Sequence, residues 1–322
     1  MLRAIVTRLL TGLVVLWGAA TATFLALHAL PGRIEDVLAG DLSYPGLREA
    51  IAAQWGLDHS LPWQYGHFLW QLLHGDLGTS YVMQQPVSAV LSSQLWPTLQ
   101  LAAAAALLAI VLSFVIACST AGIGGNAHPF GGGARRLPRM GVWAGAGASA
   151  VEQVLTSTPV FWLGLLLLIG FSFHWHWFPV SGAAGFSALV LPAVTLALPT
   201  AGVLSQVMRE SLERALTQPF ATTVRARGAS EWRLRVRHAL RHALLPVLTL
   251  GGWMIGGLLG GAVITEKLFG RPGLGTVTLD AVTSQDVPVV LAVVLLAAFV
   301  HVVISTLLDI AYLFVDPRLR RD

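Results

Sequence analysis

Long apolar runs without charged side chains dominate the chain and predict helices that cross a membrane. Residues 77–134 and 153–208 contain no Asp, Glu, Lys or Arg. A membrane helix needs about 20 mostly apolar residues. We therefore expect six spans, near residues 9–30, 99–118, 153–173, 188–208, 242–265 and 287–308. The aromatic sequence from His174 to Gly182 divides the longest run into two spans and is typical of a membrane interface.

The composition agrees with a membrane protein. Only 11% of the 322 residues are charged, 55% are apolar, and the mean hydropathy is +0.70. A soluble domain carries roughly 25% charged residues, so this composition excludes disorder and a nucleic-acid-binding arm and argues against a soluble enzyme. The single cysteine, Cys118, excludes an internal disulfide and Cys-rich metal sites. The predicted fold is an all-α, polytopic membrane helix bundle with no metal site.

The placement of basic residues predicts the orientation. Six spans put both termini on one side, which would hold 16 of the 20 Lys and Arg residues, eight of them between Arg209 and Arg241. The other side would hold Arg33, Arg48, Lys267 and Arg271. Because basic residues collect in cytoplasmic loops, we expect both termini in the cytoplasm. Glu152 and Asp309 then stand at cytoplasmic ends of spans.

Four parts are expected along the chain. They are the N-terminus with the first span (1–30), an extracytoplasmic segment (31–96), a core with the other five spans and a cytoplasmic loop at 209–245 (97–315), and a cytoplasmic tail (316–322). Helix-compatible stretches at Tyr44–Trp55 and Trp63–Leu73 indicate that segment 31–96 is a small helical unit. It is either a functional lid against the membrane or an interfacial platform that anchors the first two spans.

The loop 209–245 carries the most specific pattern. Pro219 should end the helix that leaves the fourth span. Residues 220–227 can form two turns stopped by Gly228, and Ser230 can cap the next helix. On that helix, apolar residues recur at helical spacing (Trp232, Val236, Ala239, Leu240 and Ala243), and Arg233, Arg237 and Arg241 recur on another face. The loop alone allows arginines at lipid phosphates or a short helix offered to a cytoplasmic partner.

Two stretches are rich in glycine. In the fifth span, small residues repeat every four positions, which favours close helix packing (Gly252, Gly256, Gly257, Gly260 and Gly261). A substrate path beside that helix is a second interpretation. Residues 119–134 resemble a flexible linker, because no strand precedes these glycines and no Lys follows them as a phosphate-binding loop requires.

Together these motifs resemble a known family, the permeases of binding-protein-dependent ABC importers, in their dipeptide/oligopeptide branch. The loop match is Thr223-x-Arg225-Ala226-Arg227-Gly228 followed by Arg237-His238-Ala239-Leu240-Arg241 and Pro246. The acidic residue that opens the general family motif is absent, and Thr222, Thr223 and Val224 stand there. Further matches follow in family order at Leu30-Pro31-Gly32, Gly56-Leu57-Asp58, Pro62-Trp63-Gln64-Tyr65, Gly75-Asp76-Leu77-Gly78, Pro97-Thr98-Leu99, Pro159, Trp177-Phe178-Pro179, Leu191-Pro192, Pro199, Glu266, Pro272-Gly273-Leu274-Gly275, Asp286 and Asp316-Pro317-Arg318.

The resemblance implies a permease of the bacterial inner membrane that moves solute inward by alternating access. The short loop helix would couple it to an ATPase subunit through Phe220, Thr223, Arg225, Ala226, Arg227, Gly228, Ala229 and Ser230. The implied partners are a second homologous permease, two ATPase subunits that bind ATP and Mg, an extracytoplasmic solute-binding protein and membrane lipid, with no nucleic acid. The solute-binding protein would dock on segment 31–96, with Trp63, Tyr65, Asp76 and Gly78 as candidates. Peptide is the implied cargo, with nickel, a haem-like or a sugar-like solute as alternatives.

Other function classes agree less well with the sequence. An ATPase of the phosphate-loop type is excluded, because the single lysine, Lys267, is followed by Leu268 and not by Ser or Thr. A membrane protease has only the short sequences ending at Ser149 and Ser230 in its favour. A free-standing secondary transporter usually shows internal repeats and charges inside its spans, and the predicted spans are nearly free of charge. The sequence therefore predicts a transport subunit without its own ATPase site, no bound cofactor and no identifiable substrate-binding residues.

Overall fold

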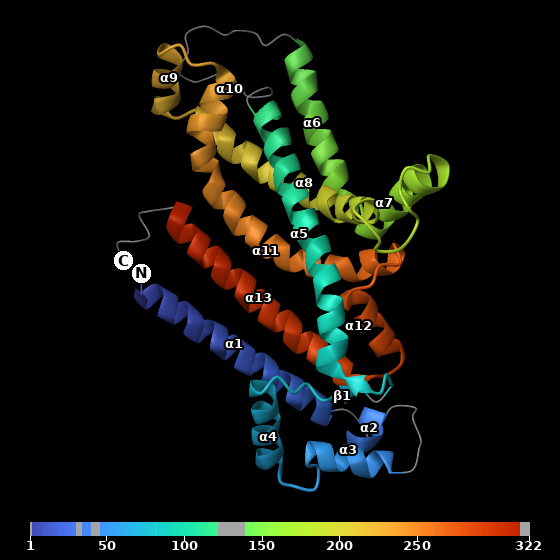
Figure 1. Ribbon diagram of the computed structural model, residues 1–322. Coiled ribbons are helices and arrows are strands. Elements are labelled where there is room, and N and C mark those ends of the chain that lie inside the picture. The colour runs from blue at the N-terminus through green and yellow to red at the C-terminus, as the bar shows by residue number, and fades with distance from the viewer. Residues whose placement is uncertain (1, 30–33, 40–45, 81, 122–138, 316–322) are drawn as a thin grey trace. The chain divides into compact units, whose positions relative to one another are not determined.

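A computed structural model of the chain describes residues 2–29, 34–39, 46–80, 82–121 and 139–315 (Figure 1). Most of the predicted linker 119–134 and all of the tail 316–322 lie outside the described residues. The described part is mostly helical. It divides into two compact units, Met1–Leu99 with Gly270–Leu307, and Gln100–Phe269 with Leu308–Asp322.

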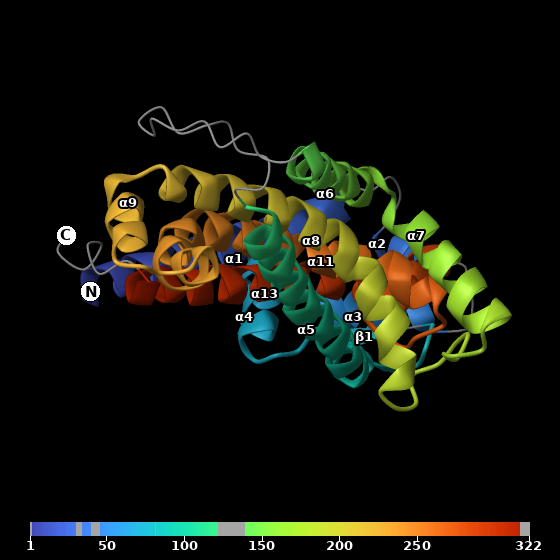
Figure 2. The ribbon, with the colours of Figure 1, turned by 90° about the horizontal axis from the view of Figure 1, so that it is seen from above.

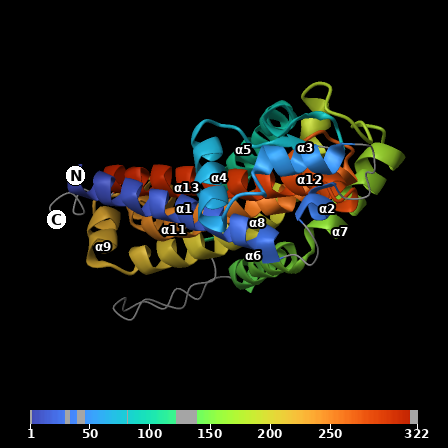
Figure 3. The same cartoon turned by 90° about the horizontal axis from the view of Figure 1, so that it is seen from below.

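The first unit combines the N-terminal part of the chain with residues 270–307. It comprises α1 (Leu2–Ala29), α2 (Ile34–Ala39), α3 (Leu47–Trp55), α4 (Leu61–Leu73), β1 (Thr79–Ser80), β2 (Gln85–Pro86), the first turns of α5 (Val87–Thr120), α12 (Leu274–Thr283) and most of α13 (Val287–Val315). Helix α4 crosses α1, and Phe68 is buried against Ala20 and Phe24 (Figure 3). Helices α3 and α4 match the helix-compatible stretches expected in segment 31–96.

A short hairpin in this unit was not predicted. β1 and β2 pair antiparallel with Ser80 opposite Gln85, and the turn between them uses Gln84 at φ 55°. The Ser80 hydroxyl donates to the buried carboxylate of Asp286, just before α13, and accepts from the backbone N–H of Met83 at 2.9 Å. Burial raises the pKa of the Asp286 carboxyl, and hydrogen bonds from Ser80 and Val289 oppose this more weakly. The hairpin therefore ties the start of α13 to segment 31–96.

The second unit is built around α8 (Ser187–Leu216). Its other elements are the rest of α5, α6 (Arg139–Ser157), α7 (Val160–Leu167), the π-helical segment η1 (Leu168–His174), α9 (Pro219–Ala226), α10 (Glu231–Arg233), the π-helical segment η2 (Leu234–Ala239) and α11 (Leu240–Leu268). Helix α8 packs against both α6 and α11, and Figure 2 shows these three helices from above. Ala197 and Ala201 of α8 are fully buried with Ala109 of α5. Small residues thus let the central helix approach its neighbours closely.

Four described helices are long and apolar enough to span a membrane: Val6–Ala29, Val87–Thr120, Ser187–Leu216 and Val287–Leu308. Two bent pairs raise this number to six if each pair forms one span, Ser149–Ser157 with Val160–His174 and Pro246–Gly252 with Gly256–Leu268. The first pair covers the third span expected near 153–173, and it bends by 103°. Pro159 explains this bend, because proline lacks the N–H of a helical hydrogen bond and its ring disfavours helix at Thr158.

Candidate functional site

The loop predicted to bind a partner forms a separate short helix. Gln218 is extended (φ −74°, ψ 154°), so α8 ends before α9 begins at Pro219, a position where a helix needs no N–H. Gly228 has φ +79°, and its N–H donates to the Arg225 carbonyl at 2.9 Å. A left-handed glycine is a common helix end, because it has no Cβ to clash. The predicted two-turn helix ended by Gly228 is confirmed.

One side of α9 is anchored in the second unit and the other side is open. Ala221 is fully buried in a cluster that we call the loop core, and Phe220 and Val224 pack against it. Its other buried members are Ala117, Cys118, Ala121, Leu204, Met208, Leu212, Ala215, Leu216, Leu234, Ala239, Ala243 and Val247. The exposed side of α9 carries Thr222, Thr223, Ala226 and Arg227. The helix is thus fixed to α5, α8 and α11 while it presents a free surface.

The turn after α9 is closed by contacts within the loop. The Arg225 guanidinium donates to both carboxylate oxygens of Glu231, at 2.8 and 3.2 Å. The Ser230 hydroxyl accepts from the backbone N–H of Arg233 at 3.3 Å, which confirms the predicted cap. Arg225 therefore has a structural partner that the sequence motif did not indicate, whereas Arg227 and Gly228 are exposed.

The apolar face predicted after Ser230 is partly wrong. Trp232 is 55% exposed, and Leu234 is fully buried in its place. The reason is the π-helical winding of η2, which adds a residue per turn and shifts the spacing assumed for an α-helix. Val236 and Leu240 still pack on the loop core, and Arg233, Arg237 and Arg241 are all exposed as expected.

The glycines of the fifth predicted span occupy different surroundings. A Cβ on Gly252 would lie 2.4 Å from Leu308 Cδ1, and one on Gly261 would lie 3.0 Å from Leu196 Cδ2. At these two positions the glycines lie close to leucine side chains of neighbouring helices within the unit, which agrees with helix packing. A Cβ on Gly257 or Gly260 would meet no described atom within 4 Å. Gly256 starts the second arm of the bent helix.

The residues predicted to dock a solute-binding protein lie on and after α4. Trp63 stacks between His59 and His67, with ring centroids 4.1 and 4.9 Å away, and is 45% exposed. The Tyr65 hydroxyl shares a hydrogen bond of 2.7 Å with Thr21 of α1. Exposed Asp76 accepts from the N–H of Gly78 at 2.9 Å. Trp63 and Asp76 therefore present surface, whereas Tyr65 holds α4 to α1.

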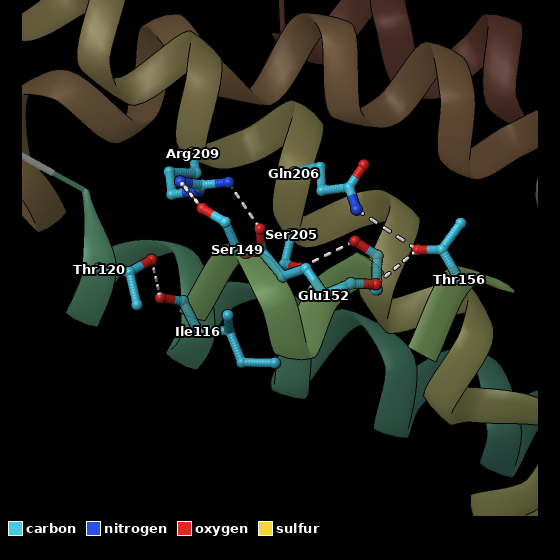
Figure 4. Close-up of polar contacts among 9 residues, drawn as sticks. Ile116, Thr120, Ser149, Glu152, Thr156, Ser205, Gln206 and Arg209 are labelled. Carbon is cyan, nitrogen blue, oxygen red and sulfur yellow. Dashed lines mark hydrogen bonds and ion pairs between the residues drawn. The ribbon is translucent and has the colours of Figure 1, made fainter. Parts of the chain in front are cut away.

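A polar seam between α6 and α8 was missed by the sequence analysis. Glu152 is fully buried inside α6, and the Arg209 guanidinium of α8 lies 2.6 Å from its carboxylate and 3.0 Å from the Ser149 hydroxyl (Figure 4). Glu152 thus lies in the interior of α6, near the start of the candidate bent span that begins at Ser149. The available signal was that Glu152 and Arg209 bound the charge-free run 153–208.

The geometry does not support the alternative interpretation of the chain as a membrane protease. Ser149 accepts from Arg209, and Ser230 caps a helix, so both serines weighed for a protease have structural partners. Among the described residues, no group of three or more His, Cys, Asp or Glu side chains is placed to hold a metal ion.

Comparison with known families decides the class of the protein. Residues 131–321 match the family described as binding-protein-dependent transport system inner membrane component, and residues 1–102 match the corresponding N-terminal family. The chain belongs to this family. It is a multi-pass permease subunit of an ABC importer in the inner membrane and does not carry the ATPase site of its system.

Relatives of this permease cover nearly its whole length. A Brucella abortus (strain 2308) protein named as a peptide transport system permease is 34% identical, over 94% of each chain. The glutathione transport system permease protein GsiC of Salmonella choleraesuis (strain SC-B67) is 33% identical, over 99% of each chain. A structure of the MetNI methionine ABC transporter in inward-facing conformations has a TM-score of 0.54 at 15% identity, covering 70% of this chain and 96% of that one. The last similarity concerns the fold alone.

Proposed function

We propose that this permease carries peptides inward by alternating access, driven by ATP that separate subunits bind and hydrolyse with Mg. The relatives named as peptide and glutathione permeases, aligned over almost the full chain, support this cargo. The proposed assembly contains this chain, a second homologous permease, two ATPase subunits, an extracytoplasmic solute-binding protein and surrounding lipid. Trp63 and Asp76 are the exposed candidates for contact with the solute-binding protein.

The proposed topology has six spans and cytoplasmic termini. The two bent helix pairs each count as one span, which brings the candidate spans to six. This topology places the eight arginines between Arg209 and Arg241 on the cytoplasmic side, as the distribution of basic residues requires. Helix α9 would then face the cytoplasm, where ATP is available.

The structure of α9 is the observation that carries the coupling role. Breaks at Gln218 and Gly228 separate α9 from its neighbouring helices, its inner side is packed in the loop core, and its outer side is exposed. A force applied to the exposed side is passed by close-packed side chains to α5, α8 and α11. Helix α9 therefore has the form of a coupling helix that an ATPase subunit binds. Separately, Gly257 and Gly260 of α11 offer a surface of small residues for contact with the second permease.

Two substitutions test this role in the complete importer reconstituted in lipid vesicles. Gly228→Val forces a β-branched residue to φ +79° at a position with open space, so it strains the end of α9 without a clash. Arg225→Glu puts two carboxylates together at Glu231. We expect both variants to keep ATP hydrolysis and to lose most peptide uptake per ATP.

A matched control separates coupling from general strain. Gly185 has φ +80° and equally open surroundings in the loop before α8, so Gly185→Val should keep uptake per ATP near that of the wild type. Exchanging the charges with Arg225→Glu and Glu231→Arg should restore uptake if Arg225 acts by closing the turn. Normal uptake per ATP in both Gly228→Val and Arg225→Glu would refute the coupling role of α9.

A further inference from the structure

The seam between α6 and α8 contains three contacts in register. We define the α6–α8 seam as Ser149, Glu152 and Thr156 on α6 with Gly202, Gln206 and Arg209 on α8. The members on each helix are three, four or seven positions apart and so share one helical face. A Cβ on Gly202 would lie 2.9 Å from Thr156 Oγ1 and 3.2 Å from the Glu152 carbonyl oxygen. Gln206 donates to Thr156 at 3.4 Å, and Arg209 closes the seam on Glu152.

A contribution to stability is a poor explanation for the ion pair in this seam. The Glu152 side chain is fully buried and that of Arg209 is 21% exposed. Glu152 Oε1 and Arg209 Nε have no hydrogen-bond partner among the described residues. A buried pair that is incompletely hydrogen-bonded recovers little of its desolvation cost, and apolar side chains of similar size are often as stable. An ionisable residue in a candidate span is instead a candidate for function.

The position of Arg209 connects the pair to the loop core. Met208, Leu212 and Leu216 of α8 are buried in that core together with Ala221 of α9. Arg209 is seven residues before the end of α8, which is about 10 Å along a helix. A displacement of α9 therefore reaches Arg209 through one short, packed helical segment.

Glu152 connects the pair to the broken third span. Helix α6 ends at Ser157, and the chain then bends by 103° at Pro159 into α7. The break leaves α6 joined to α7 only through Thr158 and Pro159, so α6 needs other contacts to define its position. The seam provides them, because Gly202, Gln206 and Arg209 lie together beside α6.

We propose that the Glu152–Arg209 pair is a positioning clasp that makes α6 follow α8 during the transport cycle. This inference rests on the proposed coupling role of α9. The charged pair has a defined geometry, since one guanidinium contacts both Glu152 and Ser149. An apolar seam of the same size would hold the helices together but would let them slide. The clasp therefore affects how the motion of α8 is passed to α6, and not which cargo is bound.

The test uses the complete importer in lipid vesicles and measures peptide uptake per ATP hydrolysed. Single changes leave one buried charge, so the informative variant is Glu152→Leu with Arg209→Leu, which keeps an apolar, filled seam. We expect normal assembly and an uptake per ATP that falls several-fold. The exchange Glu152→Arg with Arg209→Glu should recover most of it. Ser157→Ala, an uncharged change at an exposed position of α6 outside the seam, should leave the ratio unchanged.

A measurement of the distance between α6 and α8 tests the clasp directly. Spin labels on cysteines at the exposed positions Gln153 of α6 and Glu210 of α8, with Cys118→Ser, report the spacing of the two helices. We expect one narrow distance with and without ATP in the parent, and a distance that shifts or broadens on ATP binding in the double leucine variant. A constant distance in the double leucine variant would overturn the clasp.

Failure of the clasp and failure of the coupling helix give different results. If Gly228→Val lowers uptake per ATP and the double leucine variant does not, the clasp is refuted and α9 keeps its role. If both Gly228→Val and Arg225→Glu have normal uptake per ATP, the role of α9 is refuted, and the label distance alone decides the clasp. If Gly228→Val and the double leucine variant both lose uptake per ATP, and the label distance changes in the double leucine variant, the coupling role of α9 and the clasp are both supported.

Discussion

Because α6 and α8 approach closely, a Gly→Ala substitution should change the stability of the protein in opposite directions at two positions of this helix pair. Gly202 of α8 faces Thr156, Leu155 and the Glu152 carbonyl, and a Cβ there would lie 2.9–3.2 Å from them. Gly147 of α6 is exposed, and a Cβ there would meet no described atom within 4 Å. We expect Gly202→Ala to destabilise the protein and Gly147→Ala to stabilise it.

The magnitude follows from two terms. Replacing an interior helical Gly by Ala gains about 1 kcal/mol of helix propensity when the methyl group is free of contacts. At Gly202 the methyl group overpacks the seam, and one of its contacts is a backbone oxygen that cannot rotate away. Overpacking costs about 1–3 kcal/mol, so Gly202→Ala changes the stability by about 0 to −2 kcal/mol. The two variants should differ by about 1–3 kcal/mol in their free energies of unfolding.

Thermal unfolding of the purified importer in detergent, followed by tryptophan fluorescence, measures this difference. One kcal/mol shifts the unfolding midpoint by about 2–4 °C for 150–250 residues, and by less in a larger protein. We expect Gly147→Ala to unfold above Gly202→Ala by at least about 1 °C. Equal stabilisation by both changes would show that α6 and α8 do not approach closely at Gly202, and the seam would then lose its basis.

Two further predictions concern the ends of helices. Ser230→Ala removes the cap of α10 and should cost about 1 kcal/mol in thermal stability, whereas Ser230→Asp should cost little. Because burial raises the pKa of Asp286, folding favours its protonated form, and stability is lost as the pH rises through the folded pKa. Asp286→Asn keeps an acceptor for Ser80, so it should unfold at a higher temperature than the wild type at pH 8, with an advantage that shrinks as the pH falls; an advantage that grows at low pH would contradict this.

The local structure of the loop 209–245 could be predicted from the sequence because its signals are local. Pro219 fixes where a helix can begin, Gly228 allows the left-handed turn that ends it, and Ser230 supplies a cap three residues before Arg233. Each depends on the covalent structure of one residue and its near neighbours. The presence of several apolar helices long enough to span a membrane was equally accessible, because span length is set by the membrane.

The prediction that was wrong depended on an assumed helical period, and the bend of the third span was not predicted. Trp232 was expected on the buried face, and the π-helical winding of η2 placed Leu234 there. Pro159 lies inside the stretch expected to be one span near 153–173, and that stretch bends by 103°. Both outcomes were open in the sequence, since prolines inside α5, α8 and α11 interrupt no helix to that degree. Packing against neighbouring helices decides whether a proline breaks or only bends a membrane helix.

The buried ion pair shows why a charge count along the chain does not locate functional charges. A charge that ends an apolar run is normally taken as the edge of the membrane, and Glu152 and Arg209 end the same run from its two sides. The chain turns back within that run, so its two ends meet at the α6–α8 seam and the two charges neutralise each other. Helix α6 also starts well before Glu152, at Arg139, which moves Glu152 from a helix end into a helix interior. In a permease with so few charges, opposite charges that bound one long apolar run are therefore candidates for a buried contact, and the clasp is the case that the α6–α8 experiments test.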